Sequence, residues 1–319
     1  MNIRKKKVEI PAGDRTMWEQ SIFTKVWEFG KDGAAMVKKH YKNGLMLGVF
    51  LLAMFFLGRS MGAIAFGLHL QREMSIREAA GSALENTQAL LSAENWGLGF
   101  GSEGTQPSGT ASSDKLKEYN AYYVGDAGEK KIYLTFDCGY ENGFTPKILD
   151  VLKRQKVVAA FFVTKPFIRE EAKLVKRMKK EGHIVGNHTV HHKSMPTLSD
   201  RDNKQEIIDC AQYCKEATGY DMDPFIRPPM GEYNERTLAL TKKMGYRTIF
   251  WSMAYVDFKV DQQPGKDYVI EHFQKYTHKG AIPLIHNISR SNAEALETVI
   301  INLKKDGYRF EGLKKLPDY

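Results

Sequence analysis

Seven residues with catalytic or metal-binding side chains stand out in the C-terminal two thirds of the chain: Asp137, Cys138, His188, His192, Arg227, Asp257 and His286. His188 and His192 are four residues apart, so both imidazoles can approach one metal ion from the same side of a loop or first helical turn. A catalytic zinc site needs three protein ligands and an open position for water. The third ligand must come from another segment, and Asp137 and Cys138 are its predicted sources. The alternative for this histidine-rich loop is an ordinary surface segment.

The other side chains suit acid–base catalysis beside such a metal. A carboxylate near an activated water can serve as general base, and a titratable group opposite it can protonate the leaving group. Asp137 and His286 fit these two roles. Arg227 and Asp257 would orient and tune them as outer-shell partners, with a structural ion pair as the alternative. For His286 the alternative is a histidine with satisfied hydrogen bonds at a strand end.

The elements that must position these residues follow from the hydrophobic pattern after Asp114. Short apolar runs alternate there with helix-length amphipathic stretches, which predicts an α/β domain with mostly parallel strands. Seven strands are expected, at residues 131–137, 158–163, 183–186, 224–227, 246–251, 281–286 and 308–311. Helices are expected at residues 145–155, 170–181 and 200–218, and starting near residues 234, 266 and 292.

Seven strands separated by six helices are one unit short of an eightfold barrel and too many for a small doubly wound sheet. We therefore expect a distorted (β/α)7 barrel or an incomplete one. In barrels of this kind, active-site residues follow the C-terminal ends of the strands. The candidate residues fall at such positions in one unit after another, which favours a common site.

An apolar segment divides the N-terminal part of the chain. Residues 44–58 carry no charge, and apolar character resumes after Ser60 as far as Leu68, which is long enough to cross a bilayer. We predict a transmembrane signal anchor over residues 44–68. Residues 1–43 hold ten Lys or Arg against five acidic residues, so the positive-inside rule places them in the cytoplasm and the later domain outside. The alternative is a signal peptide with its core at residues 45–57 and cleavage at Ala63-Ile64-Ala65.

Residues 69–113 are expected to form a stalk and a flexible linker before a catalytic domain over residues 114–319. The run 97–113 contains five Gly and four Ser, a composition that buries too little apolar surface to order itself. The domain that follows carries 34 basic and 28 acidic residues without a basic and aromatic stripe. This charge balance argues against nucleic acid as a partner.

Five motifs give the chain a resemblance to the polysaccharide deacetylase family, also called carbohydrate esterase family four, from Lys131 to Leu316. They occur in the family's order: Thr135-Phe136-Asp137-Cys138-Gly139 is similar to TFDDG, His188-Thr189-Val190-His191-His192 to His-Ser/Thr-x-x-His, Arg227-Pro228-Pro229-Met230-Gly231 to RPPxG, Asp257-Phe258 to a common Asp-Trp, and Leu284-Ile285-His286 to Leu-x-His. One such motif is weak, but five in order are specific.

The resemblance implies a deformed barrel and metal-dependent removal of N-acetyl groups from a glycan, with zinc or cobalt-like ions favoured. It implies that Asp137 is the base, that His286 is the acid, and that His188 and His192 are metal ligands. Arg227 would then hold the base.

Further roles follow from the same resemblance. Asp257 would tune His286, and the backbone N–H of Met230 would help to receive the oxyanion. Phe258 and Leu284 would line the acetyl pocket.

Several shorter stretches resemble one subgroup, the muramic δ-lactam forming deacetylases of spore cortex peptidoglycan. They are residues 140–143, 251–254, 286–289 and 292–296. In that subgroup N-acetylmuramic acid without its peptide is deacetylated, and the freed amine closes on the lactyl carboxylate. An exported, membrane-tethered catalytic domain suits such a wall substrate. The alternatives are a deacetylase of N-acetylglucosamine in wall glycan or a chitin-like polymer, and a non-catalytic wall-glycan binding protein.

Cys138 departs from the wider family, which has a second metal-binding Asp at this position, although the δ-lactam subgroup commonly lacks that Asp too. A thiolate binds zinc well, so Cys138 or a water is expected as the third ligand. Weak metal binding is a further alternative. Cys210 and Cys214 lie one turn apart on a predicted helix, where a disulfide fits badly, so we expect buried thiols.

Overall fold

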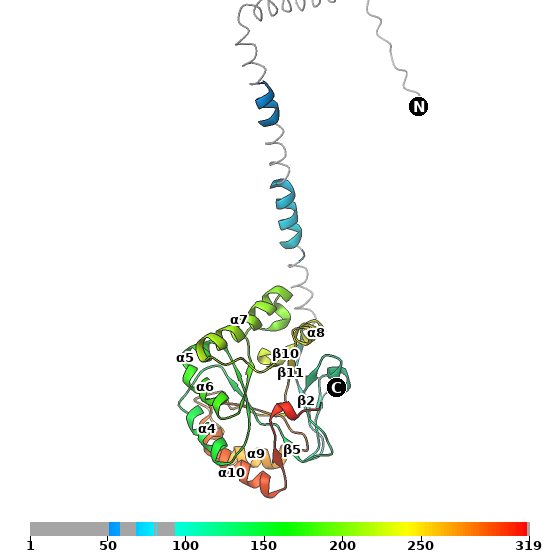
Figure 1. Ribbon diagram of the computed structural model, residues 1–319. Helices are drawn as coiled ribbons and strands as arrows, with labels where there is room; N and C mark the ends of the chain where they lie inside the picture. Colours follow the sequence, from blue (N-terminus) through cyan, green and yellow to red (C-terminus); the bar gives the residue numbers. More distant parts are fainter. Residues whose placement is uncertain (1–50, 58–67, 80, 82–92, 318–319) are drawn as a thin grey trace, which may run out of the picture. The chain divides into compact units, whose positions relative to one another are not determined.

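The computed structural model describes residues 51–57, 68–79, 81 and 93–317 (Figure 1). The chain divides into two units, residues 1–79 and 80–319. Residues 51–57 and 68–79 are helical. Within the described residues, no helix combines the length and the apolar character that a membrane span requires. The basic segment 1–43 and most of the predicted anchor 44–68 lie outside the described residues.

An eight-stranded sheet forms the centre of the second unit, and each of its neighbouring strands pairs in parallel. The strand order is β12 (Met253–Ala254), β13 (Pro283–His286), β6 (Thr135–Cys138), β7 (Ala160–Val163), β8 (Ile184–Asn187), β9 (Phe225–Ile226), β11 (Arg247–Ile249) and β4 (Ala121–Tyr122). The register places His286 directly beside Asp137. In the described part of the chain the edge strands β4 and β12 do not pair with each other, so the barrel is incomplete.

The sequence predicted the α/β class and six of the strands, but the seven-stranded barrel needs correction. The seventh expected strand, residues 308–311, contains β14 (Arg309–Phe310), which pairs with β5 (Lys131–Ile132) in a separate two-stranded sheet. The sheet instead gains β4 and β12. Each of these is only two residues long, too short to produce a hydrophobic period that the sequence would reveal.

Helices cover the outer side of the sheet (Figure 1). They are α4 (Thr145–Arg154), α5 (Lys165–Glu170), α6 (Ala172–Lys180), α7 (Asp200–Thr218), α8 (Glu235–Lys243), α9 (Lys266–Tyr276) and α10 (Arg290–Lys305), with the short α3 (Ser113–Lys117) preceding them. Helix α7 begins where the Ser199 side chain accepts a hydrogen bond from the Asp202 N–H, and it ends at Gly219, whose φ is 79°. A serine N-cap and a glycine C-cap are common helix ends that can be recognised in a sequence. The sequence therefore predicted the bounds of this helix closely.

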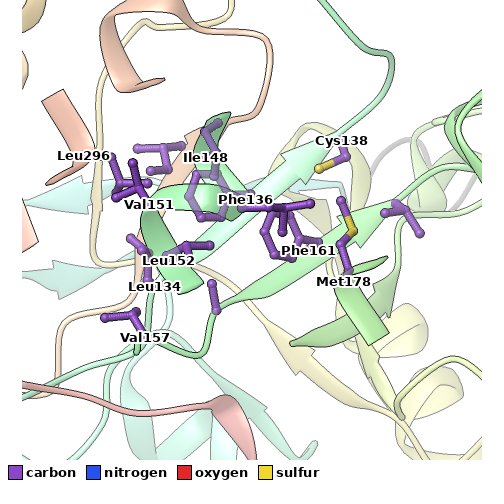
Figure 2. Packing of buried hydrophobic residues seen from close by; sticks show 14 of the residues in the cluster. Leu134, Phe136, Cys138, Ile148, Val151, Leu152, Val157, Phe161, Met178 and Leu296 are labelled. Atoms are coloured by element: carbon purple, nitrogen blue, oxygen red, sulfur yellow. The ribbon is translucent and has the colours of Figure 1, made fainter. Parts of the chain in front are cut away.

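The main core lies between the sheet and these helices (Figure 2). Because side chains alternate along a strand, Phe136 and Cys138 of β6 point into this core. There they join Ile148 and Leu152 of α4 and Phe161 of β7. The same alternation directs Thr135 and Asp137 to the opposite face of β6.

Residues 94–110, named here the N-terminal strap, pack against the domain instead of forming a free linker. The strap contains β1 (Glu94–Asn95), β2 (Leu98–Gly99) and β3 (Ser108–Gly109); β2 and β3 pair with each other, and β1 pairs with β10 (Glu232–Tyr233). Trp96 is only 6% exposed. The predicted flexible linker at residues 97–113 and the domain start at residue 114 are therefore corrected, because β2 pairs with β3 and the Pro107 carbonyl oxygen accepts a hydrogen bond from the Tyr123 hydroxyl.

Candidate active site

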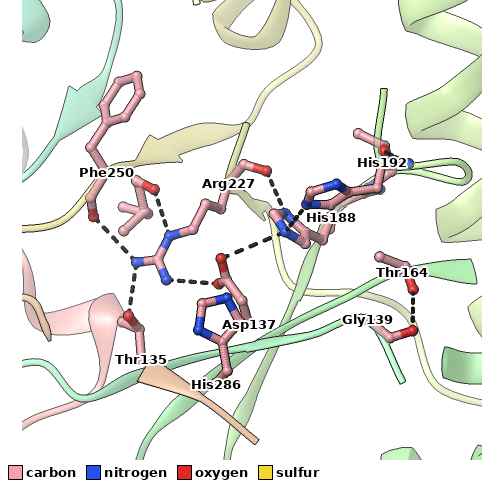
Figure 3. A network of polar contacts seen from close by, with 12 residues as sticks. Thr135, Asp137, Gly139, Thr164, His188, His192, Arg227, Phe250 and His286 are labelled. Carbon is pink, nitrogen blue, oxygen red and sulfur yellow. Dashed lines mark hydrogen bonds and ion pairs between the residues drawn. The ribbon is translucent and has the colours of Figure 1, made fainter. Parts of the chain in front are cut away.

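The histidine-rich loop begins directly after β8 and has an unusual backbone. Thr189 and His192 adopt φ values of 66° and 53°, which are costly for residues with a Cβ. The Asn187 side chain accepts a hydrogen bond from the Thr189 N–H at 2.9 Å, and the Thr189 hydroxyl accepts one from the His192 N–H at 3.1 Å. This turn brings Nε2 of His188 to 3.1 Å from Nε2 of His192 (Figure 3).

Glu206 of helix α7 forms hydrogen bonds with this loop. The sequence did not single out this residue. Its carboxylate accepts hydrogen bonds from the backbone N–H groups of Val190 at 3.0 Å and His191 at 2.8 Å. The other oxygen lies 2.6 Å from Nδ1 of His191. Glu206 is one of several acidic residues on α7, and no spacing distinguishes it from the others in the sequence.

The two facing imidazoles fit a divalent metal ion. Nδ1 of His188 lies 2.8 Å from the Arg227 carbonyl oxygen, which can only accept, so Nδ1 carries the proton and Nε2 presents a lone pair. Burial lowers the pKa of His188 to about 4 and also lowers the pKa of His192, so both rings are neutral near pH 7. Neutral imidazole is the form that binds metal.

The described residues do not place a third metal ligand beside the two histidines. The described residues contain no group of three or more His, Cys, Asp and Glu side chains arranged to hold a metal ion. The nearest carboxylate oxygen, Oδ2 of Asp137, lies 3.5 Å from Nε2 of His188. The protein thus offers two imidazole ligands, with the carboxylate of Asp137 or a water as the source of a third.

Cys138 does not point toward this pair, and the prediction that its thiolate completes the metal site is corrected. Its side chain is fully buried in the same core cluster as Phe136 (Figure 2). Asp137 lies on the opposite face of β6 and lines the cavity. Burial, together with the nearby charge of Asp137, raises the pKa of the thiol well above its usual value. A neutral, buried thiol is a poor zinc ligand. Cys210 and Cys214 are buried free thiols, as predicted.

Asp137 is held by Arg227, which is fully buried. Nη1 of Arg227 donates to Oδ1 of Asp137 at 2.8 Å, and Nη2 donates to the Thr135 hydroxyl at 2.8 Å (Figure 3). The carbonyl oxygens of Ile249 and Phe250 accept the remaining guanidinium hydrogen bonds. Burial works to raise the pKa of Asp137, but the charge of Arg227 outweighs it and the net shift is downward, so the carboxylate is ionised. Thr135 was missed, although its place two residues before Asp137 puts it on the same strand face.

His286 is backed by Asp257. Oδ1 of Asp257 lies 2.6 Å from Nδ1 of His286, and Oδ2 accepts the His286 backbone N–H at 2.7 Å. The Asn292 side chain donates to the same Oδ2 at 2.7 Å. Burial works to lower the pKa of His286, but the hydrogen bond and charge of Asp257 outweigh it and raise the pKa above its usual value. Nδ1 faces Asp257, which leaves Nε2 for the cavity.

A cavity of about 510 Å³ collects these groups at the C-terminal ends of the strands. Its lining is Asp137, Gly139, Tyr140, Thr164, Pro166, His188, Val190, His191, His192, Phe258, His286, Asn287 and Ile288. The Phe258 ring meets His286 edge to face at a centroid distance of 5.5 Å and is half exposed. Met230 and Leu284 do not belong to the lining. Met230 lies in the 3-10 turn η2 (Pro229–Gly231), which follows Arg227.

Comparison with known proteins places this geometry in a family. The family model for polysaccharide deacetylase matches residues 124–249. The peptidoglycan-N-acetylmuramic acid deacetylase PdaA of Bacillus subtilis (strain 168) is 44% identical over 223 residues, which cover 70% of this chain and 85% of PdaA. The chain belongs to the polysaccharide deacetylase family.

Solved structures of polysaccharide deacetylases share the fold. The structure of Bacillus subtilis PdaA, a family 4 carbohydrate esterase, matches with a TM-score of 0.68 over 70% of this chain and 96% of that one. A family 4 carbohydrate esterase from Bacillus anthracis is 41% identical and has a TM-score of 0.58 over 70% of this chain and 95% of its own. A further relative, found by sequence, is a peptidoglycan-N-acetylglucosamine deacetylase of Bacillus cereus, which is 33% identical over 60% of this chain and 90% of its own length. The fold and the enzyme class of this polysaccharide deacetylase are therefore established.

Proposed function

We propose that the chain is a metal-dependent peptidoglycan deacetylase that acts on N-acetylmuramic acid residues lacking a peptide and so leads to muramic δ-lactam. The observation that carries the proposal is that an ionised Asp137 and a His286 of raised pKa line one cavity together with the facing pair His188 and His192. The identity of 44% with PdaA supports the muramic substrate.

The reaction replaces the acetamide by a free amine and acetate, with the consumption of one water. Asp137 takes a proton from the attacking water, while Arg227 keeps its carboxylate oriented. His286 donates a proton to the leaving amine, and Asp257 stabilises the charged imidazole that stands ready to do so. On the family resemblance alone, we assign the backbone N–H of Met230 to the developing oxyanion. When bound by His188 and His192, a divalent ion, for which we propose zinc, supplies Lewis acidity toward the acetyl carbonyl and water.

Formation of the lactam follows from the chemistry of the product. The amine released on C2 of muramic acid attacks the lactyl carboxyl carbon of the same residue, and a water leaves. A peptide on the lactyl group removes the free carboxylate, so only peptide-free residues can close the ring. Tyr140 and Phe258 are half exposed at the cavity, where aromatic rings can pack against a sugar face.

We also propose that this domain acts outside the cell, tethered through residues 44–68. The proposal rests on the charge asymmetry around that apolar segment. Protease added to intact cells without their wall should then degrade residues 93–317 and leave a cytoplasmic marker intact. Protection of the domain under these conditions would contradict this topology.

The experiment that tests the activity uses the full chain loaded with zinc and two glycans. One is peptidoglycan pre-treated with a muramoyl amidase, and the other is an oligomer of N-acetylglucosamine. Products are identified by mass spectrometry. Asp137→Asn and His188→Ala serve as inactive controls.

We expect loss of acetyl followed by loss of water on the amidase-treated glycan alone, and neither loss with the two variants. Acetyl loss from the oligomer would instead support a glucosamine substrate. An inactive wild-type chain on both glycans, across zinc, cobalt and manganese, would support a glycan-binding protein without turnover.

A further inference from the structure

Trp96 of the N-terminal strap contacts two segments that lie near Arg227. Its backbone N–H donates to the Gly231 carbonyl oxygen at 2.9 Å, and its indole Nε1 donates to the Trp251 carbonyl oxygen at 2.9 Å. The indole also stacks on Phe250, with ring centroids 4.5 Å apart and an interplanar angle of 22°. Trp96 therefore joins two segments that are far apart in the sequence, the turn ending at Gly231 and the residues after β11.

Both segments belong to the surroundings of Arg227. The Phe250 carbonyl oxygen accepts a hydrogen bond from Nη2 of Arg227 at 3.2 Å. The Trp251 ring lies 5.9 Å from the Arg227 guanidinium carbon. Arg227 in turn donates to the predicted base, so a shift of residues 250–251 would be transmitted to Asp137 through one buried side chain.

The strap also contacts the turn at residues 229–231, which contains Met230. Met230 and Gly231 both have positive φ, 59° and 70°, and a non-glycine residue in this region stores strain that the surroundings must offset. The Trp251 ring fills the space beside Gly231, where an added Cβ would lie 2.5 Å from Cη2 of Trp251. The hydrogen bond from Trp96 and this ring contact together hold the turn that contains Met230, whose N–H the proposed function assigns to the oxyanion.

We propose that the N-terminal strap is a positioning element of the active site, which acts through Trp96 on the Arg227–Asp137 pair and on the turn that carries Met230. Trp96 touches no reacting group in this scheme. The inference rests on the proposed function, because it concerns the groups assigned there to the base and the oxyanion.

The strap is shaped to hold Trp96 in this place. Gly109 of β3 lies against the indole, and a Cβ built on it would be 2.2 Å from Cη2 of Trp96. At Gly101, in the same strap, an added Cβ would meet only the Thr105 hydroxyl at 3.4 Å. Neither glycine has a positive φ. Gly109→Ala and Gly101→Ala are thus a matched pair, of which only the first displaces the tryptophan.

The test uses the full chain with three variants: Gly109→Ala, Gly101→Ala and Trp96→Phe. The last removes the indole N–H and part of the ring packing while keeping an aromatic side chain. Hydrogen exchange of the segment 228–233 is measured by mass spectrometry. In parallel, kcat and KM are measured with zinc and the amidase-treated glycan. Thermal unfolding confirms that each variant is folded at the assay temperature.

We expect Gly109→Ala to speed exchange at residues 228–233 and to lower kcat about tenfold, with KM within about twofold of wild type, because binding groups stay while reacting groups shift. Trp96→Phe should change both in the same direction by less. Gly101→Ala should match wild type in both. A strap with a merely structural role would lower the unfolding temperature of Gly109→Ala and leave kcat unchanged.

Two results would overturn the inference. The first is wild-type kcat in a folded Gly109→Ala chain, and the second is unchanged exchange at residues 228–233. Failure of the proposed function gives a different result, because the wild-type chain would then be inactive on the amidase-treated glycan. Exchange would still decide whether the strap holds the turn.

Discussion

At Cys138 the alternation of side chains along a strand decides what the residue does. The thiol is buried in the core, and Asp137 next to it faces the cavity. We therefore expect Cys138→Ala to keep kcat within about twofold of wild type, while the free energy of unfolding falls by about 1 kcal/mol through lost packing. Activity assays and urea unfolding check both parts. Loss of zinc binding in this variant would restore Cys138 as a ligand.

Asp257 sets the proton affinity of His286, and its removal should appear in the pH profile. In Asp257→Asn the imidazole loses a carboxylate partner at 2.6 Å, so the pKa of His286 falls. A general acid must be protonated, so activity is lost as pH rises through this pKa. We expect the alkaline limb of kcat to move to lower pH by about one unit. An unmoved alkaline limb would show that His286 is not the acid.

The sequence identified site residues that have ionisable or metal-binding side chains and that lie at or after the end of a predicted strand. The sequence singled out six residues that the structure brings together: Asp137, His188, His192, Arg227, Asp257 and His286. Glu206 was not found, because an acidic residue on a helix has no distinctive pattern. Cys138 was misassigned because adjacency in sequence was given more weight than the alternation of strand faces.

At the scale of elements, helix α7 and the histidine-rich loop form one unit through Glu206. The loop carries positive φ at Thr189 and His192, and three hydrogen bonds to Glu206 offset that strain. We expect Glu206→Ala to weaken zinc binding about tenfold or more, as loss of a supporting partner does in metal sites. Isothermal titration calorimetry on the metal-free chain gives this value without an activity assay.

A control for that variant lies on the same helix. Glu216 is exposed and pairs only locally, with the Gln212 amide at 2.8 Å. Glu216→Ala should bind zinc as tightly as wild type. Equal zinc affinities of the two variants would show that Glu206 does not position the loop.

The elements themselves were predicted well where helical or strand periodicity is long. Helix α7 runs over the expected residues 200–218, and α4 and α9 also begin where expected. The two-residue strands β4 and β12 and the N-terminal strap were missed. Their order comes from long-range contacts, such as the stacking of Trp96 on Phe250, which local composition does not contain.

At the scale of the whole domain, buried neutral histidines link folding to pH. His183 is 4% exposed, and its Nδ1 accepts the Ala159 N–H at 3.2 Å, so Nε2 carries the single proton. Within the described residues Nε2 has no hydrogen-bond partner. Burial lowers the pKa of His183 to about 4. Protonation in the folded state would place an unpaired charge in this interior.

The sign of the pH effect follows from this lowered pKa. An unfolded chain binds a proton at His183 near pH 6.5, and the folded chain does so only near pH 4, so stability is present above pH 6.5 and falls as pH drops through this window. Between pH 7.5 and pH 5, His183 should remove about 2 kcal/mol of unfolding free energy. His183→Asn keeps an acceptor for the Ala159 N–H but has no proton to gain, so its stability should fall by about 2 kcal/mol less than that of wild type over the same interval. Urea unfolding of both proteins at the two pH values measures the difference, and equal pH slopes would show that His183 is already charged or solvated in the folded domain.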